Sequence, residues 1–275
     1  MSEETFNDNH FAFLDSILSG MQPITLEEMK TVKLMNRTDT KYLTNRQTLR
    51  EMAQHWESLF YVQDIDGLRS ARYTTLYFDT RDALTYTIHH NQRLHRQKIR
   101  QRHYLDTGSI FLEVKNKINT GRTKKKRIEI PEHAWGTLYE HPETAEFLRQ
   151  KVWVTDEPLT PRLQNHFQRV TLVNRARTER ITIDSGIRFQ NKVSQCEADV
   201  SDLVIVEVKQ DGNKSSDFKE LLLNARVPQR GLSKYCLGML LTDEQIKYNR
   251  FKDKVRYVSK LIGQPLQICS EKNIH

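Results

Sequence analysis

Charged and apolar side chains alternate along several short segments of the chain. In residues 98–102, for example, cations occupy every even position. Because successive side chains of a β-strand point to opposite faces, each segment predicts a strand with one charged and one apolar side. The segments are 37–41, 98–102, 110–115, 125–130 and 204–209. A sheet with one solvated face explains any one of them, but rows dominated by Arg and Lys with isolated acids favour the lining of an anion site.

Residue type and capping signals predict the other elements. β-Branched and aromatic residues indicate strands, and capping residues before amphipathic stretches indicate helices. The strands are expected over 37–43, 71–79, 97–104, 109–115, 124–130, 168–176, 179–183 and 202–209. The helices are expected within 1–30 behind a Thr25–Glu28 capping box, from Asn45 to about Trp56, within 131–154 and over 217–224. His89 and His90 are interpreted as neighbours in a strand, pointing to opposite sides.

These elements predict an α+β fold in one sheet-dominated domain. The 275 residues contain no internal repeat, no low-complexity tract and no Gly- or Pro-rich linker that would divide them. We expect a short helical extension over 1–30, the sheet domain over 31–242, and a helical tail over 243–275 that packs on or beside the domain.

The charge balance predicts an anionic partner. The chain has 43 Lys and Arg against 35 Asp and Glu, a net charge of +8. Nucleic acid, a phosphate compound and an anionic membrane surface all suit such an excess. The sequence has no helix-turn-helix, zinc-finger or RNA-recognition signature, and its aromatic residues do not interleave with the basic rows as stacking platforms would. Nucleic acid is therefore not the expected partner.

The chain has the features of a soluble protein of a reducing compartment. Cys196, Cys236 and Cys269 are far apart and form no C-x-x-C pair, so neither a disulfide framework nor a zinc site is expected. The N-terminus is acidic and polar, unlike a secretory signal, and no window approaches the roughly 18 consecutive apolar residues that span a bilayer. We expect a cytoplasmic protein, and leave open a place at the periphery of a membrane.

A closed barrel would explain the charged rows. If the strands close with their charged sides inward, burial of each cation is costly unless an anion compensates it. A chain of phosphates would do so, because Arg pairs bidentately with phosphate oxygens and Lys acts as a movable point charge. The isolated acids Glu113, Glu129 and Glu207 are then candidate ligands for a divalent cation, which binds one or two carboxylates plus the phosphates of its substrate.

A series of short motifs runs through these strands. They are Asp39-Thr40-Lys41-Tyr42, Leu76-Tyr77-Phe78-Asp79-Thr80, Lys98-Ile99-Arg100-Gln101-Arg102-His103-Tyr104, Phe111-Leu112-Glu113-Val114-Lys115, Lys125-Lys126-Arg127, Arg180-Ile181-Thr182-Ile183-Asp184, Val206-Glu207-Val208-Lys209 and Ser233-Lys234-Tyr235. In order and spacing they resemble the VTC (vacuolar transporter chaperone) polyphosphate polymerase domain of the triphosphate tunnel metalloenzymes, a CYTH-like superfamily. The resemblance covers roughly residues 33–241.

The resemblance implies a closed eight-stranded antiparallel β-barrel decorated with helices, a tunnel in which the triphosphate of ATP lies on basic side chains. It implies an ATP-dependent polyphosphate polymerase that transfers the terminal phosphate of ATP onto a growing chain with Mn²⁺ or Mg²⁺. Catalytic roles carry over to Lys41, Arg100, Arg102, Lys115, Arg175 and Arg180. Phosphate binding carries over to Lys98, Lys125, Arg127, Lys209, Ser233 and Lys234, and metal binding to Glu207 and Glu113.

Two other functions stay open beside the polymerase. A metal-dependent triphosphatase or nucleotide phosphohydrolase would release phosphate without chain growth, and a non-catalytic polyphosphate-binding module would bind triphosphate without product. ATP and inorganic polyphosphate are the expected ligands, and a membrane-protein partner is left open. The membrane helices of the eukaryotic family members have no counterpart in this sequence.

Two positions depart from the resembled pattern. Tunnel enzymes often begin with a Glu-x-Glu-x-Lys strand, where this chain has Arg37-x-Asp39-x-Lys41, a difference that favours the VTC-like branch over the triphosphatases. A Tyr expected two residues before Arg175 is Val173, which removes a ring contact near the triphosphate.

Ordinary structural roles compete with several assignments. Glu207 and Lys209 would also suit a cross-strand ion pair, and the basic run 124–127 a solvated loop or a nucleic-acid patch. Ser233 would serve equally well as a helix N-cap, and Asp184 is interpreted as a turn residue.

Overall fold

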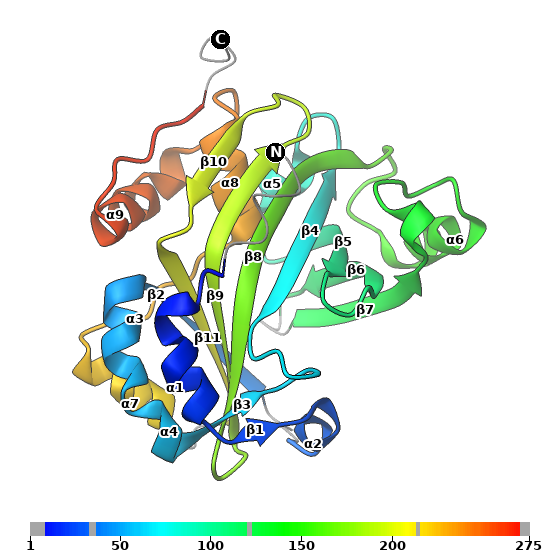
Figure 1. The fold of residues 1–275 in the computed structure, drawn as a ribbon. Helices are drawn as coiled ribbons and strands as arrows, with labels where there is room; N and C mark the ends of the chain where they lie inside the picture. The colour runs from blue at the N-terminus through cyan, green and yellow to red at the C-terminus, as the bar shows by residue number, and fades with distance from the viewer. Residues whose placement is uncertain (1–8, 33–36, 120–122, 213–214, 270–275) are drawn as a thin grey trace.

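One strongly curved sheet forms the centre of the molecule (Figure 1). The computed structural model describes residues 9–32, 37–119, 123–212 and 215–269. Within these residues the strands are β1 (Pro23–Ile24), β2 (Arg37–Asn45), β3 (Phe60–Gln63), β4 (Ala71–Asp79), β5 (Arg96–Tyr104), β6 (Ile110–Lys117), β7 (Thr123–Ile130), β8 (Thr160–Asn174), β9 (Glu179–Asn191), β10 (Glu197–Val200) and β11 (Leu203–Asp211).

Helices cover both sides of this sheet. They are α1 (Asp15–Gly20), α2 (Leu26–Lys30), α3 (Arg46–Ala53), α4 (Trp56–Leu59), α5 (Leu84–His90), α6 (Pro142–Lys151), α7 (Asp217–Asn224), α8 (Lys234–Thr242) and α9 (Lys252–Ile262). Short 3-10 turns lie at Ala12–Leu14, Glu132–Ala134 and Asn249–Phe251. In the described part of the chain, no helix has both the length and the apolar character needed to cross a membrane.

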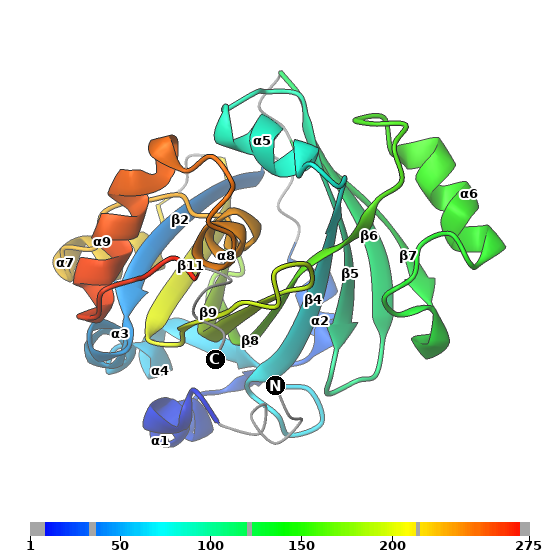
Figure 2. The same ribbon diagram turned by 90° about the horizontal axis from the view of Figure 1, so that it is seen from above.

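The described strands form an open sheet, which corrects the closed eight-stranded barrel expected above. Eight strands lie in the order β2-β11-β9-β8-β4-β5-β6-β7, and β1, β3 and β10 bring the sheet to 11 strands. Figure 2 shows the two ends, β2 and β7, on opposite arms of the curve. Residues 123–127 of β7 are exposed and include three consecutive lysines, and charged edges of this kind oppose pairing with another strand. The antiparallel pairing along this path agrees with the expectation, but the sheet does not close into a barrel.

The convex side of the sheet is apolar and lies under helices. One core cluster joins β8, β9 and β11 to α3, α4 and α7, with Trp56 and Phe218 fully buried at its centre. A second cluster joins β4, β5 and β6 to α6, with Leu112 and Val114 fully buried. The alternation read from the sequence is therefore explained: every second side chain faces these helices, and the others face the concave side.

α8 lies on the concave side of the sheet, between its two arms (Figure 2). Gly238 allows this helix to approach closely, because a Cβ there would lie 2.4 Å from Phe189 and 2.5 Å from Leu163. α9 packs beside it through Val255 and Val258. The apolar helix therefore covers one part of the concave face, and the rest of that face carries the charged rows.

Several local predictions are confirmed and others are wrong. The Thr25–Glu28 capping box starts α2, and the Asn45 side chain caps α3 by accepting the Thr48 N–H at 2.9 Å. The helix expected to run on to Trp56 is interrupted, since α3 ends at Ala53 and α4 starts at Trp56. His89 and His90 lie in α5 and not in a strand. β8 and β9 are much longer than the predicted strands 168–176 and 179–183.

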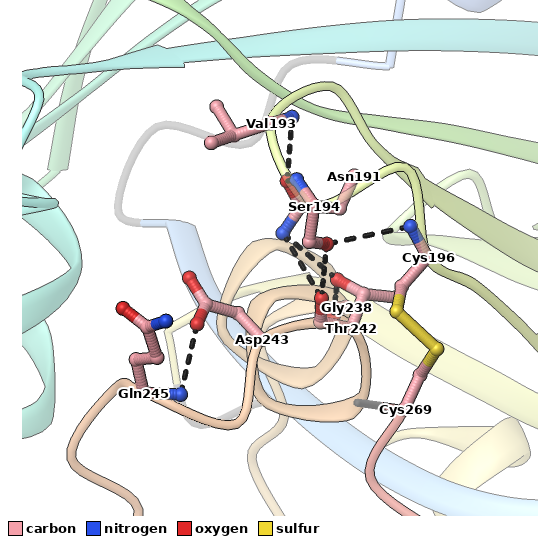
Figure 3. Close-up of a disulfide and its surroundings, with 9 residues drawn as sticks. All are labelled: Asn191, Val193, Ser194, Cys196, Gly238, Thr242, Asp243, Gln245 and Cys269. Atoms are coloured by element: carbon pink, nitrogen blue, oxygen red, sulfur yellow. Dashed lines mark hydrogen bonds between the residues drawn. A yellow bond between two sulfur atoms is a disulfide. The ribbon is translucent and has the colours of Figure 1, made fainter. Parts of the chain in front are cut away.

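A disulfide joins Cys196 to Cys269, where no disulfide was expected (Figure 3). The two residues are 73 apart in sequence, but both lie beside the C-terminal end of α8. There the Cys269 N–H donates to the Leu241 carbonyl at 2.9 Å. Only the tertiary fold brings them together. Cys236 is free and buried in α8. The inference of a reducing compartment, which depended on unpaired cysteines, thus loses its basis.

Loss of the disulfide is expected to lower the free energy of unfolding by about 2–4 kcal/mol, because the bond closes a long loop in the unfolded chain. The measurement is urea unfolding with and without dithiothreitol. Reductant should destabilise the wild type and a Cys236→Ala control, and leave Cys196→Ser unchanged. An unfolding midpoint of the wild type that ignores the reductant would contradict this prediction.

Candidate anion-binding site

The sheet register brings the charged positions of neighbouring strands into rows on the concave face. Arg100 on β5 lies opposite Glu113 on β6, which lies opposite Arg127 on β7. At the other end of the sheet, Lys41 on β2 lies opposite Glu207 on β11. Side chains that are directly opposite in an antiparallel pair share one face. The charged sides predicted for the single strands therefore join into one continuous charged surface.

Cations outnumber carboxylates on this surface. The cations that project from the concave face or from the start of α8 are Lys41, Lys98, Arg100, Arg102, Lys115, Lys125, Arg127, Arg169, Arg180, Lys209 and Lys234. The carboxylates among them are Glu113, Asp184 and Glu207, with Asp39, Glu129 and Asp211 towards the ends of the rows on β2, β7 and β11. Because so many like charges lie together, the surface has a large excess of positive potential.

Glu113 is a fully buried carboxylate held between two cations. Its Oε2 accepts from Arg100 Nε at 2.7 Å and Nη2 at 2.5 Å, and its Oε1 accepts from Lys125 Nζ at 2.8 Å. Burial alone would raise the pKa of Glu113, but Arg100, Arg102 and Lys125 lower it well below its ordinary value. Both oxygens are occupied, so the geometry does not support the predicted role of Glu113 as a metal ligand.

Asp184 is also a buried bridge between cations, and its interpretation as a turn residue is wrong. It lies inside β9 and accepts from Arg169 Nε at 2.5 Å and Nη2 at 2.8 Å, and from the Lys234 ammonium of α8. Burial would raise the pKa of Asp184, but Arg169 and Lys234 lower it. The turn signal Ser185-Gly186 misled the prediction, because the strand continues through Gly186 at a positive φ of 65°.

Lys115 and Lys41 have no ion pair or side-chain hydrogen bond within the described residues. The positive charge of Arg100, followed by burial, lowers the pKa of Lys115 well below its ordinary value, and Lys41 acts in the same direction. Lys41 belongs to the first strand of the sheet path and Lys115 to the seventh, so their interaction crosses the concave side. The two arms thus bring uncompensated cations close together, where an anion would stabilise both.

The start of α8 brings Ser233 and Lys234 to this surface, next to Lys98 of β5. Ser233 is the N-cap, as its structural interpretation predicted, and its Oγ accepts the Cys236 N–H at 3.3 Å and Lys98 Nζ at 2.8 Å. Burial lowers the pKa of Lys98 to about 8 and that of Lys234 to about 7. A bound polyanion would raise both values, because it favours the charged ammonium.

Glu207 is the carboxylate best suited to a divalent cation. It is bonded to Lys209 at 2.7 Å, but this ion pair lies within β11 and not across two strands as the ion-pair interpretation expected. The Glu207 side chain is 23% exposed. In the described chain no group of three or more His, Cys, Asp or Glu side chains could hold a metal ion. Mg²⁺ and Mn²⁺ are often held by one or two carboxylates together with substrate phosphates, so Glu207 fits such an ion only when phosphates complete its coordination.

Arg175 lies away from the charged face. It follows β8, donates to the Glu57 carbonyl at 2.7 Å and to Gln22, and its guanidinium lies 4.3 Å from the Tyr61 ring. Val173, where a Tyr was expected, is fully buried against Ile24 and Met29 of the N-terminal segment. This segment covers the end of the face where the missing ring would have been.

Two aromatic rings beside the cations, those of Tyr73 and Phe167, were not predicted as part of the site. The guanidinium groups of Arg102 and Arg169 lie 5.4–5.6 Å from the rings of Tyr73 and Phe167, and Lys234 Nζ lies 4.1 Å from the Phe167 ring. Arg169 alternates with the apolar Val170 in β8, so the same parity rule would have found it. By contrast, Arg127 is exposed and lies 4.2 Å over the Phe111 ring.

Comparison with known proteins identifies one family. The model of the VTC domain family matches residues 36–242. No curated protein matches the chain.

Several solved structures share the outline of the fold at low identity. A putative adenylate cyclase from Vibrio parahaemolyticus is 12% identical, with 74% of this chain and 99% of that chain covered and a TM-score of 0.43. A putative adenylyl cyclase from Hippeastrum, described as having a dominant triphosphatase activity, is 15% identical, with 74% and 94% covered and a TM-score of 0.43. The PH1819 protein of Pyrococcus horikoshii OT3 is 13% identical, with 74% and 98% covered and a TM-score of 0.40. Likenesses this distant support no inference about activity.

The buried carboxylates should make stability depend on pH. The pKa values of Glu113 and Asp184 are lower in the folded chain than their ordinary values of 4.5 and 3.8. Their contribution is therefore present above those ordinary values and is lost as pH falls below about 4, by up to ~1.4 kcal/mol per pH unit per carboxyl. Urea unfolding at pH 7, 4 and 3 measures this loss.

A Glu113→Gln variant tests which group is responsible. It should be less stable at pH 7 by about 3–5 kcal/mol, because Arg100 is left buried without its partner. Its loss of stability between pH 5 and 3 should be smaller than that of the wild type. Glu129→Gln, on an exposed position of β7, is the matched control and should behave as the wild type. Equal pH profiles for all three chains would refute the assignment.

Proposed function

Because the chain belongs to the VTC domain family, we propose that it is an ATP-dependent polyphosphate polymerase. The observation that carries the proposal is the excess of cations over carboxylates on the concave face. Lys41 and Lys115 form no ion pair among the described residues, because the neighbouring acids Glu113 and Glu207 are paired with other cations. Uncompensated, partly buried cations are costly in an empty protein, and a polyanion supplies the missing charge.

The arrangement of the cations favours a linear chain of phosphates over a single small anion. Along one strand the cations recur at every second residue, about 6.6 Å apart, and on neighbouring strands about 4.8 Å apart. A lone phosphate could contact only two or three of them. ATP and inorganic polyphosphate, in contrast, present charged oxygens at successive positions along such a row, so each phosphate meets at least one Arg or Lys.

The proposed reaction is in-line phosphoryl transfer. A terminal oxygen of the polyphosphate attacks the γ-phosphorus of ATP and forms a new P–O bond, and the bond to the β,γ-bridging oxygen breaks with its electron pair left on ADP. Arg100, Arg102 and Lys115 hold the equatorial oxygens and stabilise their charge. No side chain acts as a nucleophile, because positioning and electrostatic stabilisation supply the catalysis.

A divalent cation, Mn²⁺ or Mg²⁺, forms part of the proposal, with Glu207 as its protein ligand. When bound, such an ion neutralises phosphate oxygens and orients the leaving group. In the structure Glu207 is ion-paired with Lys209. The Lys209 Nζ also lies 3.3 Å from Thr182 Oγ1, so this ammonium has a second partner and can leave Glu207 to bind a phosphate.

The triphosphatase and the non-catalytic binder remain the alternatives. With water in place of the phosphate acceptor, the same cations would support hydrolysis of a triphosphate. With no productive alignment, they would support binding alone. The products of ATP turnover separate the three, because only the polymerase makes a phosphate chain.

Incubation of the chain with ATP and Mn²⁺ or Mg²⁺ should yield a polyphosphate ladder on a stained polyacrylamide gel. Arg100→Ala and Glu207→Ala should each reduce the ladder about 100-fold or more, the loss typical of a group that stabilises transition-state charge. Arg149→Ala, on an exposed helix position far from the face, is the control and should leave the ladder unchanged. Free phosphate without a ladder would favour the triphosphatase, and triphosphate binding without product would favour the binder.

The family resemblance assigns both Arg175 and Arg180 to catalysis, whereas the geometry supports that role for Arg180 alone. Arg180 lies opposite Lys209 on the charged face, whereas Arg175 is bonded to groups outside it. Arg180→Ala should weaken triphosphate binding about tenfold or more, the worth of one charge-assisted hydrogen bond. Arg175→Ala should mainly lower the melting temperature. A larger loss of affinity in Arg175→Ala, measured by calorimetry, would restore the assignment from resemblance.

A further inference from the structure

Asp79, at the end of β4, is a fully buried carboxylate that collects several neutral donors. Its Oδ1 accepts the N–H groups of Thr80 and Thr85, both at 2.8 Å. Its Oδ2 accepts the Thr85 hydroxyl at 2.7 Å, the Tyr86 N–H at 3.0 Å and the Tyr235 hydroxyl. Within the described residues it forms no ion pair. These donors fill the acceptor sites of a carboxylate, so Asp79 fixes whatever is bonded to it.

Four of these donors belong to the segment that starts α5, but the fifth belongs to α8. Tyr235 is the residue next to Lys234, whose ammonium contacts Asp184 on the charged face. The Tyr235 ring also packs on Tyr77 with centroids 5.0 Å apart, and Tyr77 lies opposite Arg100 in the pairing of β4 with β5. Asp79 is thus connected to the charged face through Tyr235, which leads directly to Lys234 and by way of Tyr77 to Arg100.

The first turn of α8 has polar side-chain contacts with other elements, which are those of Ser233 with Lys98, Lys234 with Asp184 and Tyr235 with Asp79. Of these, only the contact of Tyr235 uses no residue of the charged face. Gly238 lies against Phe189 and Leu163 in the middle of the helix, and Thr242 at its end is held by Asn191 at 3.2 Å. Figure 3 shows the bonds that fix this far end, near the disulfide. A helix in contact at its middle and fixed at its end can still pivot at its start unless a specific contact prevents it.

We propose that Asp79 and Tyr235 are positioning residues of the anion site: their hydrogen bond holds the first turn of α8 so that Lys234 and Ser233 stay on the charged face. The inference rests on the proposed function in that the anion is a triphosphate or polyphosphate. It adds to that function a buried hydrogen bond that fixes the positions of two phosphate contacts, Lys234 and Ser233.

The effect on affinity follows from the reach of the groups involved. Charge-assisted hydrogen bonds weaken steeply when donor and acceptor move by more than a few tenths of an ångström from their best distance. Rotation of the first turn of α8 would move the Lys234 ammonium and the Ser233 hydroxyl together. The Tyr235 hydroxyl touches no phosphate in this arrangement, so a change in affinity on its removal is transmitted by the residues that it positions.

A double-mutant cycle tests the inference in the full chain. Triphosphate dissociation constants are measured by calorimetry for the wild type, Tyr235→Phe, Lys234→Met and the double variant. Tyr235→Phe keeps the ring and removes only the hydroxyl, and it should weaken binding about fivefold or more in the wild-type background. In the Lys234→Met background it should change binding less than twofold, because residues that act through one another are not additive.

Tyr86→Phe is the matched control. The Tyr86 hydroxyl is buried in the same core cluster and donates to the Lys247 carbonyl at 2.7 Å, so its removal costs a comparable hydrogen bond without loosening α8. We expect a lower melting temperature and an unchanged dissociation constant. If Tyr235→Phe also lowers only the melting temperature, or weakens binding equally in both backgrounds, Tyr235 is structural and the inference fails.

A second readout needs no anion. The Lys234 side chain is 11% exposed, so its acylation by an amine-reactive ester, followed by mass spectrometry, should be slow in the wild type. It should become several-fold faster in Tyr235→Phe and not in Tyr86→Phe. If the wild type binds no triphosphate, the proposed function fails while this labelling still decides the inference: faster labelling in Tyr235→Phe sustains it, and equal labelling in the two variants overturns it.

Discussion

The structure depends on one electrostatic constraint, which is that a single partly buried face carries many more cations than carboxylates. On this face, the buried carboxylates Glu113 and Asp184 each bind two cations, as Glu113 binds Arg100 and Lys125. Removing such an acid would leave charge without a partner in a medium of low polarity. The remaining cations are not compensated in this way, and the anion proposed above would supply the missing negative charge. Binding and stability are therefore consequences of the same arrangement of charge.

The same face has to be both charged and apolar, and the strands change character along their length to achieve this. On β2, Lys41 belongs to the charged part and Leu43, two residues on, packs in the core under α8; on β11, Glu207 and Ile205 are related in the same way. α8 lies over the apolar part, and its first residue reaches the boundary. A helix that both closes a core and supplies Lys234 to an anion must be placed more accurately than core packing alone requires.

The alternation along single strands was enough to predict the charged face, because a strand has a period of two residues and the register then aligns the rows. It could not reveal that Asp184 pairs with Arg169 and Lys234, since that contact joins β9, β8 and α8. Nor could it reveal the Cys196–Cys269 bond, for which only the tertiary fold brings the partners together. The closed barrel was wrong for a related reason: closure depends on whether the edges β2 and β7 meet, and strand patterns contain no information about that distance.

The open edges and the charge excess are physically connected. Lys41 lies on one edge strand and Lys125 on the other. The pKa of Lys115 is lowered chiefly by Arg100, burial and Arg102 on its own arm, and repulsion from Lys41 on the opposite arm acts in the same direction. Repulsion of this kind opposes closure of the sheet, and its magnitude is reduced by any negative charge placed between the arms. A polyphosphate on this face would contact both arms at once and replace repulsion by attraction.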